Sequence, residues 1–332
     1  MTDTDTDAPV MLKREILIDK PGFYRNITSK QYFAEPCPAP ALTNSGIKTL
    51  LAKTPADFAY EHPAITPDSP EAASTAAKRL GDVCHQLALG KGRGIAIGEF
   101  DAWRSKEAKE FKADAEANGL TPIIREKYDD AMAMASIMKA KIAATLKWIG
   151  AKDGLVEPDG GWPYETEVVI AWTEETASGP IFCRAMIDVW CEDLLVALDP
   201  KFSDRFYVGI ERHMTNMSWD QQAAFYTRGI EALLPGAAGR VTFANIMVSD
   251  KEPHRSRRVM IEEAWRYSCQ LEIEKAIGLF AMYLKAGTWP EFPDGVETLN
   301  APPWLLAQRL NANEMSNDQP FGDDEDEENT DA

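Results

Sequence analysis

The chain has 332 residues, 45% of them hydrophobic, and a formal net charge of −18 at pH 7. This length and composition allow one large core or two modest ones. The first eight residues are polar and acidic and lack the basic and apolar regions of a signal peptide. No uninterrupted apolar run approaches the roughly 20 residues that a membrane-spanning helix needs. We therefore expect a soluble cytoplasmic protein without a membrane partner.

The negative charge is concentrated at the two ends of the chain. Seven acidic residues lie between Asp323 and Asp331 and three between Asp3 and Asp7, so ten of the eighteen net charges belong to the tails. The body is only mildly acidic, which leaves a nucleic-acid partner open despite the overall charge. The acidic C-terminal tail is either a segment that mimics DNA and binds a basic surface or a solubilising segment without a specific role.

Composition also suggests the domain limits. We expect a disordered N-terminal tail over residues 1–19, one main domain over 20–310 with its core at about 71–290, and an acidic disordered tail over 311–332. The five cysteines are scattered and form no CxxC pair, so we expect reduced and mostly buried thiols rather than disulfides or a zinc site.

The hydrophobic periodicity predicts helices first and then strands. A Pro- and aromatic-rich segment over 9–42 is expected to be ordered but irregular. Helices are predicted from 43–45 to Pro55 and over 71–90, 104–118 and 124–148. Alternating apolar residues predict strands over 165–172, 181–190 and 193–199, with a two-residue turn at Cys191 and Glu192, as an antiparallel meander. A helix over 217–233, a strand over 241–248, a helix over 259–286 and a Pro-rich closing segment are expected next.

Two aspartates lie near the ends of neighbouring predicted strands. Asp188 and Asp199 can meet at one edge of the sheet, and two adjacent carboxylates repel unless a hard cation such as Mg²⁺ lies between them. Lys201 follows Asp199 at the i+2 position and therefore points to the same face of its strand. An amine at this position can hold or deprotonate an attacking water and offset charge on a phosphate. The pattern indicates a metal-dependent nuclease.

Four further residues extend this candidate site. Glu167 in the preceding strand is a candidate metal ligand or water-orienting base, and His85 on the second helix can approach from the other side; as a lone histidine it can equally be a core group. Gln222 and Tyr226 are four residues apart on one helix face, where an amide and a phenol can contact a phosphate or a base. Tyr226 can instead be a core aromatic.

These residues, in the order His85, Glu167, Asp188, Asp199-Pro200-Lys201 and Gln222-Ala-Ala-Phe-Tyr226, resemble the PD-(D/E)XK nuclease superfamily. More specifically, they resemble the exonuclease domain family of exodeoxyribonuclease VIII (RecE) and its phage-encoded relatives. Three further segments resemble the same family: YFAEPCPAPALTNSGIKTLLAKTPADFAYEHP, LGDVCHQLALG and AGTWPEFPDGVETLNAPPW. The resemblance runs in unbroken order over roughly residues 20 to 310.

The resemblance implies an α+β fold with a restriction-endonuclease-like core, a central mixed sheet flanked by helices. It implies an exodeoxyribonuclease with Mg²⁺, or Mn²⁺, and two ions per site, acting on ends of linear double-stranded DNA from the 5′ end. The product would be a 3′ single strand for an annealing recombinase in the bacterial host cell, and the enzyme would be a ring-shaped homo-oligomer. By position, Asp188, Asp199, Glu167, His85 and the Pro200 carbonyl would bind metal, and Lys201 would assist the water.

The chain departs from the family pattern within the motif. Relatives carry a hydrophobic residue and two threonines where this chain has Pro200, Phe202 and Ser203. Pro200 removes one strand hydrogen-bond donor and suits an edge or bulged position. A basic residue that often lies two positions before the first aspartate is replaced by Met186, and Arg184 on the same strand face is the candidate DNA contact.

Two other functions are compatible with the same residues. A different endonuclease that uses the same metal chemistry is one alternative, and a catalytically silent nuclease-fold protein that binds DNA is the other. An iron–sulfur branch of the superfamily is disfavoured because such a cluster needs four gathered cysteines.

Overall fold

The computed structural model describes residues 15–67, 75–296 and 298–317. The chain divides into two compact units, residues 1–291 and 292–332. The second unit contains the helix α10 (Pro303–Asn317), and every other element belongs to the first. The predicted terminal tails lie largely outside the described residues, and the predicted domain limits stay a prediction.

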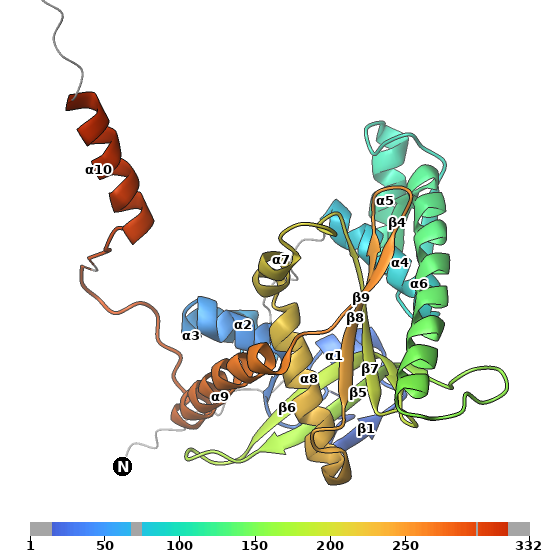
Figure 1. Cartoon of the computed structure of the whole chain (residues 1–332), viewed down its shortest axis with the longest axis horizontal. Helices are drawn as coiled ribbons and strands as arrows, with labels where there is room; N and C mark the ends of the chain where they lie inside the picture. The colour runs from blue at the N-terminus through green and yellow to red at the C-terminus, as the bar shows by residue number, and fades with distance from the viewer. Residues whose placement is uncertain (1–14, 68–74, 297, 318–332) are drawn as a thin grey trace, which may run out of the picture. The chain divides into compact units, whose positions relative to one another are not determined.

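A seven-stranded mixed sheet forms the centre of the first unit (Figure 1). Six strands lie in the order β1-β5-β6-β7-β8-β9, and β2 pairs with β6. Their bounds are Gly22–Tyr24 (β1), Ala41–Leu42 (β2), Glu165–Glu174 (β5), Ile181–Cys191 (β6), Val196–Ser203 (β7), Thr242–Ser249 (β8) and Ser256–Val259 (β9). The β7–β8 and β2–β6 pairs are parallel and the other pairs are antiparallel.

Helices surround this sheet, and a second small sheet lies apart from it. The helices of the first unit are Ser29–Phe33 (α1), Asn44–Ala52 (α2), Pro55–Glu61 (α3), Ala76–Leu89 (α4), Lys106–Ala117 (α5), Arg125–Lys152 (α6), Ile210–Met217 (α7), Trp219–Leu233 (α8) and Glu263–Ala286 (α9), with a 3₁₀ turn at Pro235–Ala237. The small sheet pairs Ile95–Gly98 (β3) in parallel with Thr121–Ile124 (β4). Helix α8 lies in the long connection that parallel pairing of β7 with β8 requires.

Two hydrophobic cores cover opposite faces of the sheet. In the first core, α8 packs on β5 and β6, and α9 and α2 pack against α8, around Trp172 and Phe225, whose ring centroids are 4.7 Å apart. In the second, α4 and α6 pack on β7 and β8 around Met138 and Ile246. Figure 1 shows α8 and α9 on one side of the strands and α6 on the other. The predicted fold class, an α+β fold with a central mixed sheet flanked by helices, is confirmed.

Several predicted boundaries need correction. The turn between β6 and β7 is not at Cys191 and Glu192, because β6 includes Cys191 and the chain reverses over 192–195, where Leu195 has a φ of +51°. Pro55 begins α3 instead of only ending α2: it occupies the first turn, where its missing N–H costs nothing, and Thr54 and Asp57 form a capping box. The segment expected to be irregular contains β1, α1 and β2. The small sheet β3–β4, the helices α7 and α10 and the edge strand β9 were also not predicted.

Two expectations from composition can be compared with the structure. All five cysteines are buried, as expected. Within the described ranges, no helix is both long enough and apolar enough to cross a membrane.

Candidate active site

The predicted carboxylates lie in one row across neighbouring strands. The β5–β6 register pairs Thr166 with Val189 and Val168 with Ile187, which places Glu167 opposite Asp188. The β6–β7 register pairs Val189 with Leu198, and its continuation by one residue places Asp188 opposite Asp199. Side chains directly opposite each other in a sheet are close neighbours, with Cβ atoms about 5 Å apart. The fold therefore brings three acidic residues together from separate strands.

Asp199 is the centre of a hydrogen-bonded network. Its side chain is only 2% exposed. Its Oδ2 atom is 2.6 Å from Lys201 Nζ and accepts a 2.9 Å bond from Asn245 Nδ2. Its Oδ1 atom accepts a 2.9 Å bond from Gln222 Nε2, and the Oε1 atom of the same amide accepts a 3.0 Å bond from Lys201 Nζ. Gln222 thus holds the carboxylate and the amine at the same time.

Burial acts differently on the two aspartates. Burial raises the pKa of Asp199 to about 6; the Lys201 ammonium opposes this rise and the charge of Asp188 adds to it. Burial also acts to raise the pKa of Asp188, but the charge and hydrogen bond of His85 outweigh it and lower that pKa. His85 Nε2 lies 3.2 Å from Asp188 Oδ2. Burial lowers the pKa of His85, and the carboxylates beside it, Asp188 foremost, raise it to about 9.

Glu167 has an unusual backbone conformation at this row. Its φ is +50°, in the left-handed region that non-glycine residues rarely adopt, at a cost of about 1–3 kcal/mol. The residue is buried, and burial raises the pKa of its carboxyl, with the His85 charge opposing the rise. Ser29 Oγ donates to its Oε2 at 3.4 Å, and Lys91 Nζ donates to the carbonyl of the preceding Thr166. One contact thus holds the Glu167 side chain, and another holds the backbone of the residue before it.

Pro200 occupies a position that its missing N–H permits. From Asp199 onward, β7 pairs only with β8 among the described strands, because the β6–β7 register ends at Leu198. Pro200 therefore lies where β7 is an edge on its β6 side, as its chemistry requires. A metal contact from the Pro200 carbonyl stays a prediction.

Two of the predicted DNA contacts are buried. Tyr226 belongs to the first core, where its ring packs edge-on against Phe243 at 6.1 Å. Arg184 is only 4% exposed; its guanidinium donates to the Tyr32 carbonyl at 2.7 Å and pairs with buried Glu35. DNA contacts from Arg184, Tyr226 and Gln222 stay predictions, and for Arg184 a contact would require this buried network to open.

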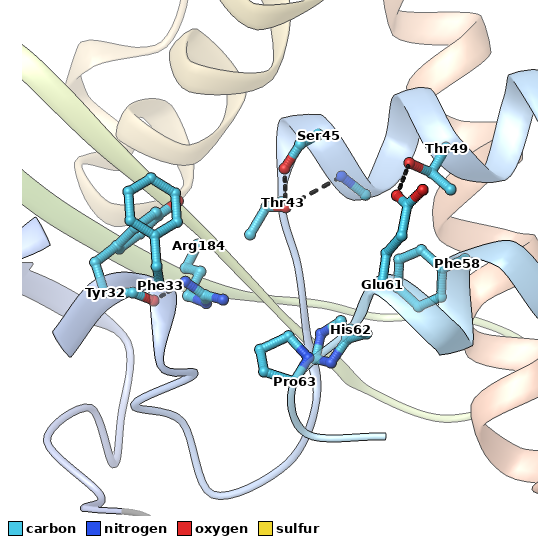
Figure 2. A pocket seen from close by; sticks show the side chains of 11 residues that line it. Tyr32, Phe33, Thr43, Ser45, Thr49, Phe58, Glu61, His62, Pro63 and Arg184 are labelled. Atoms are coloured by element: carbon cyan, nitrogen blue, oxygen red, sulfur yellow. Dashed lines mark hydrogen bonds between the residues drawn. The ribbon is translucent and has the colours of Figure 1, made fainter. Parts of the chain in front are cut away.

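Arg184 also lines a pocket of about 180 Å³ (Figure 2). Residues of α1, α2 and α3 form the remaining wall, with Thr43 and Ser45 at the start of α2. Tyr32 on the same wall has its pKa raised to about 12, first by burial and in part by the negative charge of Asp188. No carboxylate of the row is among the residues that line the pocket.

Three contacting residues were not predicted from the sequence: Asn245, Lys91 and Trp219. Asn245 is paired with Asp199 in the parallel β7–β8 register and is 1% exposed. Lys201 Nζ lies 5.2 Å from the ring centroid of Trp219, a cation–π distance. A single Asn inside an otherwise apolar strand, VTFANIMV, is the signal that would have pointed to Asn245, since buried amides need partners.

The row has the composition of a divalent cation site. Glu167, Asp188 and Asp199 offer carboxylate oxygens, the donors that Mg²⁺ prefers, and His85 offers an imidazole. The raised pKa of Asp199 reflects a buried charge that a cation would stabilise. The side chains of this row are not the group whose ligand atoms lie closest together. Among the described residues, Asp130, Glu252 and His254 have ligand atoms that all lie within 4.8 Å of one another.

Comparisons with known proteins add two structural likenesses. No protein-family model matches the chain, and no curated protein matches it. A solved structure described as a "Putative exonuclease" from Eubacterium rectale is 11% identical, with a TM-score of 0.49 over 85% of this chain and 96% of that one. The structure of SSO0001 is 14% identical, with a TM-score of 0.23 over 50% of this chain and 69% of that one.

Proposed function

We propose that the chain is a metal-dependent exodeoxyribonuclease that hydrolyses phosphodiester bonds at the ends of linear double-stranded DNA. One observation carries the proposal: Asp199 lies in a row with Asp188 and Glu167 while sharing Gln222 with Lys201. A purely structural role for this set is disfavoured by its cost. Lys201 pairs with Asp199 and His85 pairs with Asp188, so these pairs supply two cationic side chains to three gathered carboxylates, and a further cation would lower the free energy.

The carboxylates and His85 would hold the metal. A divalent cation bound there lowers the pKa of a water molecule and stabilises negative charge on the phosphate oxygens. Asp199 keeps its orientation through Gln222 and Asn245, which occupy defined lone pairs of its two oxygens. Because Asn245 and Lys201 both contact Oδ2, a metal ligand from Asp199 would be its Oδ1 atom, which accepts one bond from Gln222.

Lys201 would act on the attacking water and on the phosphate. Its ammonium is held by Asp199, Gln222 and the Trp219 ring, so its position is fixed before substrate arrives. In hydrolysis the water oxygen bonds to phosphorus, the bond to the leaving sugar oxygen breaks, and that oxygen takes up a proton. A fixed positive charge beside the phosphate offsets the negative charge that develops in this step.

Three finer features of the proposal rest on the family resemblance. These are digestion from the 5′ end, a 3′ single-stranded product that an annealing recombinase uses, and a ring of identical subunits around DNA. They would place the enzyme in a phage or prophage recombination system in the bacterial cytoplasm.

The test uses linear duplexes labelled at either 5′ or 3′ end and a closed circular duplex, each incubated with Mg²⁺, with Mn²⁺ or with EDTA. We expect metal-dependent loss of the linear substrates, release of the 5′ label first and an intact circle. Cleavage of the circle would instead support an endonuclease. DNA binding without any metal-dependent product would contradict catalysis and support a DNA-binding role.

A further inference from the structure

A second group of metal-ligating side chains joins two elements that are distant in sequence. Asp130 lies on the N-terminal part of α6, and Glu252 and His254 lie in the hairpin between β8 and β9. One ligand atom from each of the three lies within 4.8 Å of the other two. Ser249 ends β8 four residues after Asn245, the partner of Asp199, so this cluster begins about 13 Å along the strand from the carboxylate row.

A hydrogen bond to a backbone carbonyl outside the cluster selects which ring nitrogen of His254 carries a proton. Its side chain is more than nine-tenths buried, with 8% exposure. Its Nδ1 atom lies 3.0 Å from the Ser249 carbonyl oxygen, and because a carbonyl only accepts hydrogen bonds, Nδ1 must carry the proton. In the neutral imidazole, the Nε2 atom then holds the lone pair. A backbone carbonyl that orients the opposite ring nitrogen in this way is the usual second partner of a metal-binding histidine.

A buried carboxylate oxygen in the same hairpin lacks a partner. The Oδ1 atom of Asp250 is buried and makes no hydrogen bond within the described part of the chain. Asp250 and Asp130 both act electrostatically on the thiol of Cys84 and contribute to its raised pKa, which is due first to burial. Asp130 and Asp250 therefore bring negative charge from α6 and from the hairpin towards the same thiol, and a cation near both elements would lower the free energy.

One ammonium group competes for this place. Lys127 Nζ lies 2.9 Å from Asp130 Oδ2, and its side chain is about half exposed. A flexible, half-exposed lysine can move into water when a cation arrives, because a surface pair of this kind contributes little to stability. Lys127 thus weakens cation binding without preventing it.

We propose that Asp130, Glu252 and His254 form a second divalent-metal site, which takes a transition-metal cation such as Zn²⁺ in preference to Mg²⁺. An imidazole nitrogen with two carboxylate oxygens is a ligand set that suits Zn²⁺, whereas Mg²⁺ favours oxygen and water. Glu252 is exposed, so water can complete the coordination. The bound cation would tie the β8–β9 hairpin to α6, and this site is independent of the proposed nuclease chemistry.

The test measures Zn²⁺ binding by the full chain, after chelator treatment, with titration calorimetry. Excess Mg²⁺ is present throughout so that the carboxylate row does not take up Zn²⁺. We expect His254→Gln and Glu252→Gln each to weaken Zn²⁺ binding at one site by tenfold or more and to abolish a Zn²⁺-dependent rise in Tm. Asp129→Asn, an exposed neighbour on α6, is the matched control and should bind as the parent does. Lys127→Met should bind Zn²⁺ more tightly.

Further variants separate this site from the carboxylate row. Binding at the hairpin should persist in Asp199→Asn. With Co²⁺ in place of Zn²⁺, the visible absorption of the bound ion should change in His254→Gln and stay the same in Asp199→Asn. An unchanged Zn²⁺ affinity in Glu252→Gln overturns the proposal. It is also overturned if Asp199→Asn abolishes Zn²⁺ binding while His254→Gln and Glu252→Gln bind as the parent does. Because Glu252 is exposed, its variant tests the site even if the buried His254 variant fails to fold.

Discussion

Asn245 donates a 2.9 Å hydrogen bond to Asp199 from the position directly opposite it on the parallel strand β8. Both side chains are almost completely buried. Because strand pairing places Asn245 opposite Asp199, the hydrogen bond from its amide helps to orient the carboxylate. Strand β8 therefore contributes to the proposed site by orienting Asp199, although it supplies no carboxylate.

We expect Asn245→Ala to impair cleavage more than it impairs folding. Loss of the donor frees Asp199 to rotate and costs about 1–3 kcal/mol of unfolding free energy. The rate should fall about tenfold or more, with a higher Mg²⁺ concentration needed for half-maximal activity. Cleavage rates over a Mg²⁺ series, compared with thermal unfolding, separate the two effects. A parental rate and parental Mg²⁺ dependence would show that Asn245 does not position Asp199.

Substitution of Asp199 or Lys201 by alanine should abolish cleavage. Each change removes an interaction that stabilises mainly the transition state, typically several kcal/mol and hence at least a hundredfold in rate. Lys139→Ala, at an exposed position on α6, is the matched lysine control and should cleave normally. Circular dichroism should show that both inactive variants retain their fold. Activity that survives in both would place the reaction elsewhere in the chain.

Gly229 should tolerate no larger residue. A Cβ atom there would lie 2.6 Å from the ring of buried Trp172, so α8 and β5 would have to separate. We expect Gly229→Ala to lower the unfolding free energy by about 1–3 kcal/mol. Gly278→Ala on α9 is the control, since a Cβ there meets nothing within 4 Å, and it should stabilise the helix by about 0.5–1 kcal/mol. Equal effects in denaturant titrations would contradict this packing account.

The pair of Glu174 and Arg228 should make stability depend on pH in the acid range. The Arg228 guanidinium donates to both carboxylate oxygens, at 2.7 and 2.8 Å. Burial acts to raise the pKa of Glu174, but the bonds from Arg228 and Trp172 outweigh it and lower the pKa. A lowered pKa gives stability that is present above the unfolded value of about 4.3 and is lost as the pH falls through the folded value.

Thermal unfolding of the parent and of Glu174→Gln between pH 7 and pH 3 measures this contribution. The parent should be more stable by about 1–3 kcal/mol near pH 7, and the difference should shrink as the pH falls below 4. A difference that stays constant over the whole range would mean that the ion pair does not contribute through its charge.

The sequence by itself determined the main elements and the residue types of the proposed site. Periodicity alone predicted the meander of β5, β6 and β7, because alternation along a strand is a local property. It also placed Lys201 on the same strand face as Asp199, because the i+2 relation is fixed by strand geometry. The short strands β3 and β9 were missed because four residues give too little periodicity to detect.

Only the tertiary structure decided the complete set of side chains that meet. Strand registers placed Glu167, Asp188 and Asp199 in one row, and the parallel crossover through α8 brought Gln222 and Asn245 onto the same carboxylate. Burial decided that Arg184 pairs with Glu35 inside the protein, although its position on the strand suggested a DNA contact. The meeting of Asp188 and Asp199 was predictable because a short turn joins their strands. The partners Asn245 and Glu35 were not predicted, because they are far from Asp199 and Arg184 in the chain and only the fold brings them together.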